Sequence, residues 1–157
     1  MTWHGRELDT LELLAKTLEN GARLYETYSL AFPELEGFWF GLAMEEVDNS
    51  NMVHGCIVQI RRGSIHVDTG RIDQVELQSL LDLIQGELTR VRRKKIDIID
   101  AISFALNIER RIIEGEYLEV LSTYLEEIEH PVPYPVVTAK NHVKVLEQMS
   151  RDLKGNE

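Results

Sequence analysis

The sequence predicts an all-α protein, a bundle of four long helices with one further helix crossing between the second and the third. Apolar residues recur every three or four positions through most of the 157 residues, and this is the period of an amphipathic helix. Pro33 and the three prolines of the segment HPVPYP interrupt the period, because proline breaks a helix interior. Segment 63–71, GSIHVDTGR, has no helical period. It is expected to be a loop with a short extended piece at 65–67.

The first helix is expected to start at Asp9, since Asp9 and Glu12 have the spacing of a capping box, and to end near Leu30. The second is expected from Pro33, which suits a first helical turn, to about Arg62. Their inward positions are Leu11, Leu14, Leu18, Ala22 and Tyr25, then Phe38, Leu42, Glu46, Asn49, Val53, Ile57 and Ile60. The second stripe is therefore interrupted by two polar residues at mid-helix.

A crossover helix is expected to open at Asp73 and Glu76 and to end in the basic cluster 90–95. Two long helices that run in the same direction need such a connection. Cations are favoured at a helix C-terminus, so the basic cluster is interpreted as a solvated helix end rather than a nucleic-acid site. The apolar positions of the crossover helix are Val75, Leu80, Leu83, Ile84, Leu88 and Val91.

The stretch from Asp97 to Glu127 is expected to form the third long helix, with Asp97 as its cap. Its inward stripe reads Ile102, Ala105, Glu109, Ile112, Glu116 and Val120. A buried carboxylate is costly unless a cation, a hydrogen-bond partner or a shifted pKa compensates. The stripe therefore indicates either a cation site or a stripe turned so that both acids lie at its wet edge.

The fourth helix is expected to begin at Pro135 and to fray in the final residues KGNE. Its inward residues are Val136, Ala139, His142, Val145, Leu146, Met149 and Leu153. His142 thus lies on an apolar face, where it is either a metal ligand or a core histidine hydrogen-bonded to Glu46 or Glu109. In the second case Asn49 would donate its amide to a neighbouring acid. Tyr25 and Trp39 are interpreted as core packing.

Composition narrows the class of partner and the compartment. The formal net charge is −10, from 27 acidic and 17 basic residues, which disfavours nucleic acid and anionic membranes. The one cysteine, Cys56, excludes a disulfide within the chain and a CxxC redox pair. No long apolar run or leader-like N-terminus is present. A single cytoplasmic domain spanning residues 1–157, with no membrane segment, is expected.

Four segments together resemble the rubrerythrin-like branch of the ferritin-like superfamily. They are LENGARLYE, FGLAMEEVDNSNMV, AISFALNIERRIIEGEY and TAKNHVKVLEQM. The resemblance implies a ferritin-like four-helix bundle with an extra crossover helix between helices 2 and 3. It also implies a di-iron or single-iron site, an iron-dependent, peroxidase-like oxidoreductase acting on oxygen or peroxide, a homodimer and a redox partner. The two CxxC pairs of the family's rubredoxin-type site do not occur in this sequence.

The resemblance also implies a ligand set, which this chain carries in part. Residues of ligand type stand at three of the six expected positions, namely Glu46, Glu109 and His142. At the other three stand Leu18, Asn49 and Ala139. Glu46, Glu109 and His142 would form an incomplete metal site in which Glu116 or Glu19 adds a fourth donor.

Two acids near Glu46 are set apart from this ligand set, because the spacing of Glu45 and Asp48 places them beside the stripe. The alternative function, of a different class, is a metal-free bundle that self-associates or binds a partner. Its polar core would be a relic held by hydrogen bonds.

Overall fold

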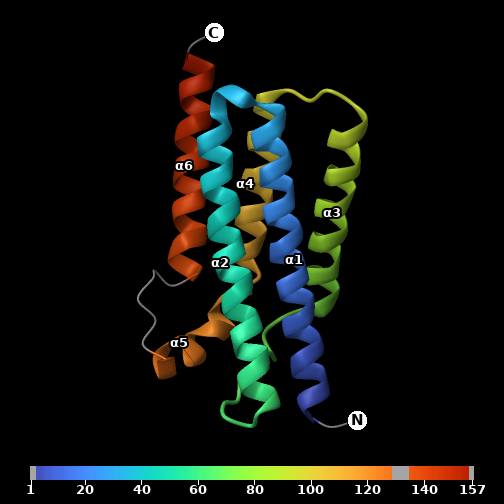
Figure 1. Cartoon of the computed structure of the whole chain (residues 1–157), viewed down its shortest axis with the longest axis vertical. Helices are drawn as coiled ribbons and strands as arrows, with labels where there is room; N and C mark the ends of the chain where they lie inside the picture. The colour runs from blue at the N-terminus through green and yellow to red at the C-terminus, as the bar shows by residue number, and fades with distance from the viewer. Residues whose placement is uncertain (1–2, 129–134, 156–157) are drawn as a thin grey trace.

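A computed structural model describes residues 3–128 and 135–155, and α-helices make up most of both ranges (Figure 1). They are α1 (Trp3–Ala31), α2 (Glu36–Arg61), α3 (Gln74–Arg93), α4 (Ile98–Glu114), α5 (Ser122–Ile128) and α6 (Pro135–Gly155), with 3-10 turns η1 (Pro33–Leu35) and η2 (Glu119–Leu121). These ranges contain no strand, so the predicted all-α class is confirmed. No helix within them has the length and apolar character needed to cross a bilayer.

The helix directions follow from the path of the chain in Figure 1. α1 and α2 run antiparallel, α3 carries the chain back along α1, and α4 then runs in the same direction as α2. α6 returns antiparallel to α4 and packs along it. The extra helix expected between the second and third long helices is therefore present as α3.

The inward stripes read from the sequence for α1 and α2 form much of the core, whereas Val75 of α3 and Val145 of α6 are exposed, at 77% and 44%. All five stripe positions of α1 are buried, as are six of the seven positions of α2, from Leu42 to Ile60. At one end of this core Trp39 is fully buried among aromatic rings, with centroids 4.7 Å from Tyr28 and 5.8 Å from Tyr25. Aromatic pairs at such distances add to the stability that burial provides. They fix α1 against α2 next to the buried polar residues.

Two helix starts are held by the aspartates expected to cap them. The Asp73 carboxylate accepts hydrogen bonds from the backbone N–H groups of Val75 and Glu76, at 2.9 and 3.2 Å. The Asp97 carboxylate accepts one from Ile99 at 2.8 Å. Each satisfies a donor that has no partner within its own helix. The predicted starts of α3 and α4 are therefore confirmed.

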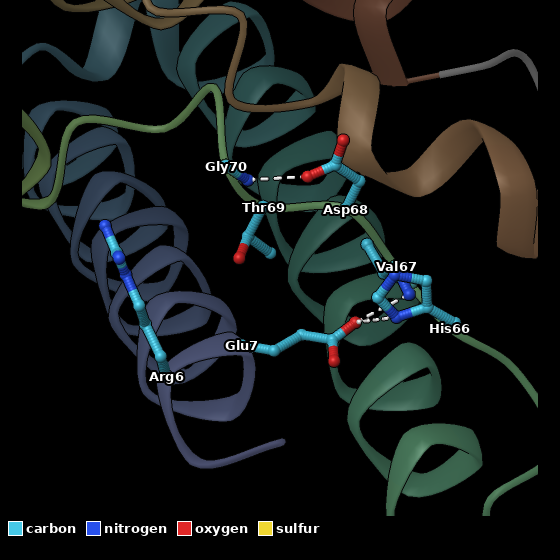
Figure 2. A pocket seen from close by; sticks show the side chains of 7 residues that line it. All are labelled: Arg6, Glu7, His66, Val67, Asp68, Thr69 and Gly70. Carbon is cyan, nitrogen blue, oxygen red and sulfur yellow. Dashed lines mark hydrogen bonds and ion pairs between the residues drawn. The ribbon is translucent and has the colours of Figure 1, made fainter. Parts of the chain in front are cut away.

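The first helix begins earlier than expected, at Trp3, so Asp9 lies inside α1 instead of capping it. Its first turns make a tertiary contact that no local pattern reveals. The buried Glu7 carboxylate accepts a hydrogen bond from the Val67 backbone N–H at 2.6 Å and lies 3.3 Å from His66 (Figure 2). The loop after α2, irregular throughout 63–73, is thereby held against the first turns of α1.

The helix expected from Asp97 to Glu127 is interrupted, because α4 ends at Glu114. Glu116 adopts the left-handed backbone conformation, with φ of 55°. The Tyr117 ring lies so close to Gly115 that a Cβ there would come within 2.3 Å of it. The absence of a Cβ at Gly115 leaves room for this ring, and the chain turns at Glu116 and continues into η2 and α5.

The prolines before the last helix fall only partly within the described ranges. Pro131 and Pro133 lie outside them, as do the last two residues, 156 and 157. α6 begins at Pro135, as expected from the tolerance of proline in a first turn. His142 is thereby placed two turns into α6.

Candidate metal centre

Three of the polar residues that interrupt the apolar stripes meet in the middle of the bundle. Glu46 comes from α2, Glu109 from α4 and His142 from α6. Each offers one donor atom, and the three donor atoms lie within 4.8 Å of one another. Their exposed fractions are 2%, 0% and 1%, respectively. The sequence therefore identified three residues that the fold brings into a single buried cluster.

The positions that carry no ligand in this sequence also face inward. Leu18, Asn49 and Ala139 are all buried, at 1%, 2% and 1% exposure. In the described ranges, no hydrogen bond joins Asn49 to Glu46 or Glu109. Asn49 therefore does not act as the amide donor that the alternative interpretation expected. Apolar side chains at two of these positions limit the number of oxygen donors around the cluster.

His142 contacts carboxylates through both of its ring nitrogens. Nδ1 lies 3.2 Å from Glu46 Oε1 and 3.2 Å from Glu109 Oε1. Nε2 contacts Glu45, whose side chain is 53% exposed and therefore reaches solvent. The imidazole thus stands between a buried pair of acids and one half-exposed acid at the surface.

Glu109 is held from a fourth helix by Tyr25 of α1. The Tyr25 hydroxyl donates a hydrogen bond to Glu109 Oε1 at 2.8 Å. The other oxygen, Oε2, is buried and has no hydrogen-bond partner in the described part of the chain. A buried acceptor without a partner costs stability. A cation would provide the partner that this oxygen lacks.

The cluster binds protons strongly. Burial, followed by the nearby Glu109 charge, raises the pKa of Glu46 to about 8. Burial by itself would lower the pKa of His142, but its hydrogen bonds to Glu109 and Glu46 outweigh that effect and raise the pKa to about 11. Burial and the Glu109 charge also raise the pKa of Tyr25, so its hydroxyl remains a donor. Positive charge in this cluster is therefore favoured, whether it arrives as protons or as a metal ion.

The donor set fits a divalent transition metal. Imidazole nitrogen and carboxylate oxygen suit iron, manganese and zinc. Two donors that bind one cation at about 2.1 Å are about 3.0 to 3.4 Å apart at octahedral or tetrahedral angles. The distances from His142 Nδ1 to the two glutamate oxygens are 3.2 Å. These two separations are compatible with a shared ion, and all three donor atoms lie within 4.8 Å of one another.

Two further residues expected as fourth donors lie outside the cluster. Glu19 is 46% exposed at its side chain and pairs with His54 at 2.6 Å on the outside of α1 and α2. Glu116 is exposed beyond the end of α4. The helical period placed it on the Glu109 face, but the turn at Gly115 removes it from that face. Neither lies in the described cluster of candidate ligands.

Two contributors were not identified as such from the sequence. Tyr25 was interpreted as core packing and Glu45 as lying beside the stripe. The signal for Tyr25 is a hydroxyl on an inward stripe, which requires a buried partner. The signal for Glu45 is its place next to Glu46, since neighbouring residues on a helix can approach one side chain from two sides.

A surface pocket of about 290 Å³ lies elsewhere, between the start of α1 and the loop after α2 (Figure 2). Its acidic members, Glu7 and Asp68, accept hydrogen bonds from the backbone N–H groups of Val67 and Gly70, respectively. The pocket shares no lining residue with the cluster. These contacts hold the loop in place, so the pocket is interpreted as structural.

Comparisons of the chain with protein-family models, with curated proteins and with solved structures found no match.

Proposed function

We propose that this protein is a rubrerythrin-like metal protein that binds one divalent transition-metal ion, with iron as the expected metal, at Glu46, Glu109 and His142. The observation that carries the proposal is the buried cluster itself. Glu46 Oε1 and Glu109 Oε1 each lie 3.2 Å from His142 Nδ1, and the second Glu109 oxygen, Oε2, has no hydrogen-bond partner in the described ranges. The order of helix directions, with α2 and α4 running the same way after a crossover, supports a ferritin-like bundle.

A single ion is favoured over a pair. A pair of metal ions needs bridging carboxylates together with terminal ligands on each ion. Leu18, Asn49 and Ala139 are buried at the positions that would supply the further ligands. Three donors with open coordination positions suit a mononuclear site that also binds a small exogenous molecule.

The residues of the chain would hold and orient such an ion. Bound iron supplies one-electron exchange with dioxygen or peroxide. The Tyr25 hydroxyl orients Glu109, and partners of this kind tune the affinity of a metal site. Burial of all three donors excludes bulk water, which strengthens every charge interaction within the cluster. The proposed activity is therefore oxidoreductase chemistry on oxygen or peroxide, with electrons from a redox partner.

The metal content of protein purified without chelator tests the proposal. Wild-type protein is expected to hold close to one iron or manganese ion per chain, and Glu109→Gln only a trace. Glu87→Gln is the matched control, because Glu87 is also buried, at 5% exposure, but lies outside the cluster. Trace metal in wild-type protein, with no uptake of added Fe²⁺ or Mn²⁺, would exclude the metal function.

A second candidate function is a metal-free bundle that self-associates or binds a partner. The observation in its favour is that carboxylates already contact both ring nitrogens of His142. A protonated imidazole can therefore supply the positive charge by itself. Under this proposal, wild-type and Glu109→Gln protein have the same trace metal content, and the acids serve only packing.

Homodimer formation remains a prediction under both proposals. Sedimentation velocity at micromolar concentration is expected to give the mass of two chains. A single species with the mass of one chain would contradict it.

A further inference from the structure

Consecutive glutamates of α2 reach opposite sides of one imidazole. Glu46 faces His142 Nδ1 at 3.2 Å, and Glu45 contacts Nε2. Neighbouring residues on a helix are about 100° apart around its axis, which lets one side chain enter the core while the next stays at its edge. The exposure of the two side chains agrees with this, at 3% for Glu46 and 53% for Glu45.

The contact with Glu45 decides which ring nitrogen is available to a cation. A neutral imidazole carries one N–H, and the other nitrogen offers its lone pair to a metal. An ionised carboxylate can only accept hydrogen bonds. Glu46 and Glu109 accept in the same way at Nδ1, but a cation bound by these two acids would displace the hydrogen there. Glu45 would then hold the remaining hydrogen on Nε2. The free lone pair is then on Nδ1, which faces Glu46 and Glu109.

We propose that Glu45 is the positioning residue of the metal site, which holds His142 by Nε2–H so that Nδ1 binds the ion. This inference rests on the proposed metal function and adds a residue outside its ligand set. Glu45 does not bind the ion in this role, because the imidazole ring lies between Glu45 and the two buried acids. It orients the ring and fixes its tautomer, as carboxylates do for histidine ligands in metal proteins.

The test compares Zn²⁺ binding by wild-type protein, Glu45→Ala, Glu45→Gln and Asp48→Asn. Losing a partner of this kind lowers metal affinity roughly 10- to 100-fold, and this is the loss expected for Glu45→Ala. Glu45→Gln keeps an oxygen that accepts the Nε2 hydrogen, so its affinity is expected within about fivefold of wild type. Asp48→Asn is the matched control. It removes an exposed charge three residues along α2, and its affinity is expected to stay within about twofold of wild type.

The second readout is the long-range ¹H–¹⁵N spectrum of His142 in the zinc-loaded protein, which a general loss of stability would not alter. Wild type and Glu45→Gln are expected to show hydrogen on Nε2 and zinc on Nδ1. Zinc on Nε2 would overturn the proposal, and so would wild-type affinity in Glu45→Ala. An equal loss in Asp48→Asn would also overturn it, by showing a general effect of surface charge. Wild-type protein that takes up no zinc, iron or manganese would instead overturn the proposed function itself, and this inference with it.

Discussion

Two buried glutamates of this bundle are bound by tyrosines one turn apart on α1, and they differ in what else they contact. Tyr28 donates to Glu87 of α3 at 2.7 Å, and Tyr25 donates to Glu109 of α4 at 2.8 Å. Both tyrosine rings pack against Trp39. The local environments are therefore closely matched, and the remaining partners of each acid reveal its role.

Glu87 is fully paired by the chain itself. Arg90 donates to its Oε1 at 2.6 Å and to its Oε2 at 3.0 Å, while Tyr28 completes the second oxygen. A planar guanidinium that binds both oxygens is the strongest partner a side chain offers a carboxylate. Glu87 thus has its cation and needs no other.

Glu109 lacks such a partner. It shares the His142 imidazole with Glu46, and its Oε2 has no hydrogen bond in the described ranges. Here one imidazole contacts two buried acids, whereas at Glu87 one guanidinium donates hydrogen bonds to a single acid. The comparison teaches that a buried acid in this fold can be fully paired by the chain, as Glu87 is, and that Glu46 and Glu109 are not paired in this way. The proposed cation would complete the partners of these two acids.

Removing the imidazole should give the largest effect. His142→Ala deletes the nitrogen ligand, so we expect metal affinity to fall by at least about 100-fold, beyond the loss seen for indirect partners. Equilibrium dialysis with Mn²⁺ or Zn²⁺ measures it. Unchanged metal occupancy would remove His142 from the site.

Removing Arg90, the charged partner of Glu87, should change the free energy of unfolding without changing metal binding. Arg90→Ala leaves Glu87 buried beside a single hydroxyl donor. We expect unfolding to require about 2 kcal/mol less, below the cost for a fully buried pair because the Arg90 side chain is 38% exposed. Urea denaturation measures the change. The comparison requires Glu87 and Glu109 to be independent. A parallel loss of metal affinity in Arg90→Ala would show that they are not.

The two tyrosines sharpen the comparison further. Tyr25→Phe removes a hydrogen bond from Glu109, so we expect metal affinity to fall about tenfold. Tyr28→Phe removes the equivalent bond from Glu87 and should leave metal affinity unchanged, at a stability cost of about 1.5 kcal/mol. Calorimetric titration and urea denaturation of the matched pair separate the effects. Equal metal affinities in the two variants would contradict the assignment of Tyr25 to the site.

A further expected effect is on the pH dependence of the metal-free protein. The folded-state pKa values of Glu46 and His142, about 8 and about 11, lie above their ordinary values of 4.5 and 6.5. A raised folded pKa gives stability that is complete below the ordinary value and lost as pH rises through the folded one. Stability should therefore fall from pH 5 to pH 10, at most by about 1.4 kcal/mol per pH unit for each proton.

Urea denaturation with chelator at several pH values checks this trend. Glu46→Gln should remove the part of the decline between pH 4.5 and pH 8, since glutamine has no proton to lose in that window. Stability that rises between pH 5 and pH 9 would contradict the assigned protonation of the cluster.

Much of this arrangement was predictable from the sequence because it follows from helical period. Glu46, Glu109 and His142 were found because each interrupts an apolar stripe, and a stripe position faces the core whichever helix packs against it. The starts at Asp73 and Asp97 depend on local hydrogen bonds and were also predicted. Glu116 was wrongly placed, because the period continues through Gly115 although the helix does not.

The contacts that distinguish the two acids were not predictable in this way. The bond from Tyr25 to Glu109 joins residues 84 positions apart, and the contact from Glu45 to His142 joins residues 97 apart. Both depend on how the helices pack against one another. Helical period assigned Glu45 to a position beside the stripe, and it is the proximity of α6 that gives this side chain a partner.

A calorimetric metal titration at pH 7, repeated in buffers of different ionisation enthalpy, tests the central claim most directly. The raised pKa values of Glu46 and His142 mean that both hold protons at this pH, and a cation that binds the same atoms must displace them. We expect one ion per chain and the release of between about one and two protons per ion. An absence of binding, or binding without proton release, would show that no cation enters the cluster.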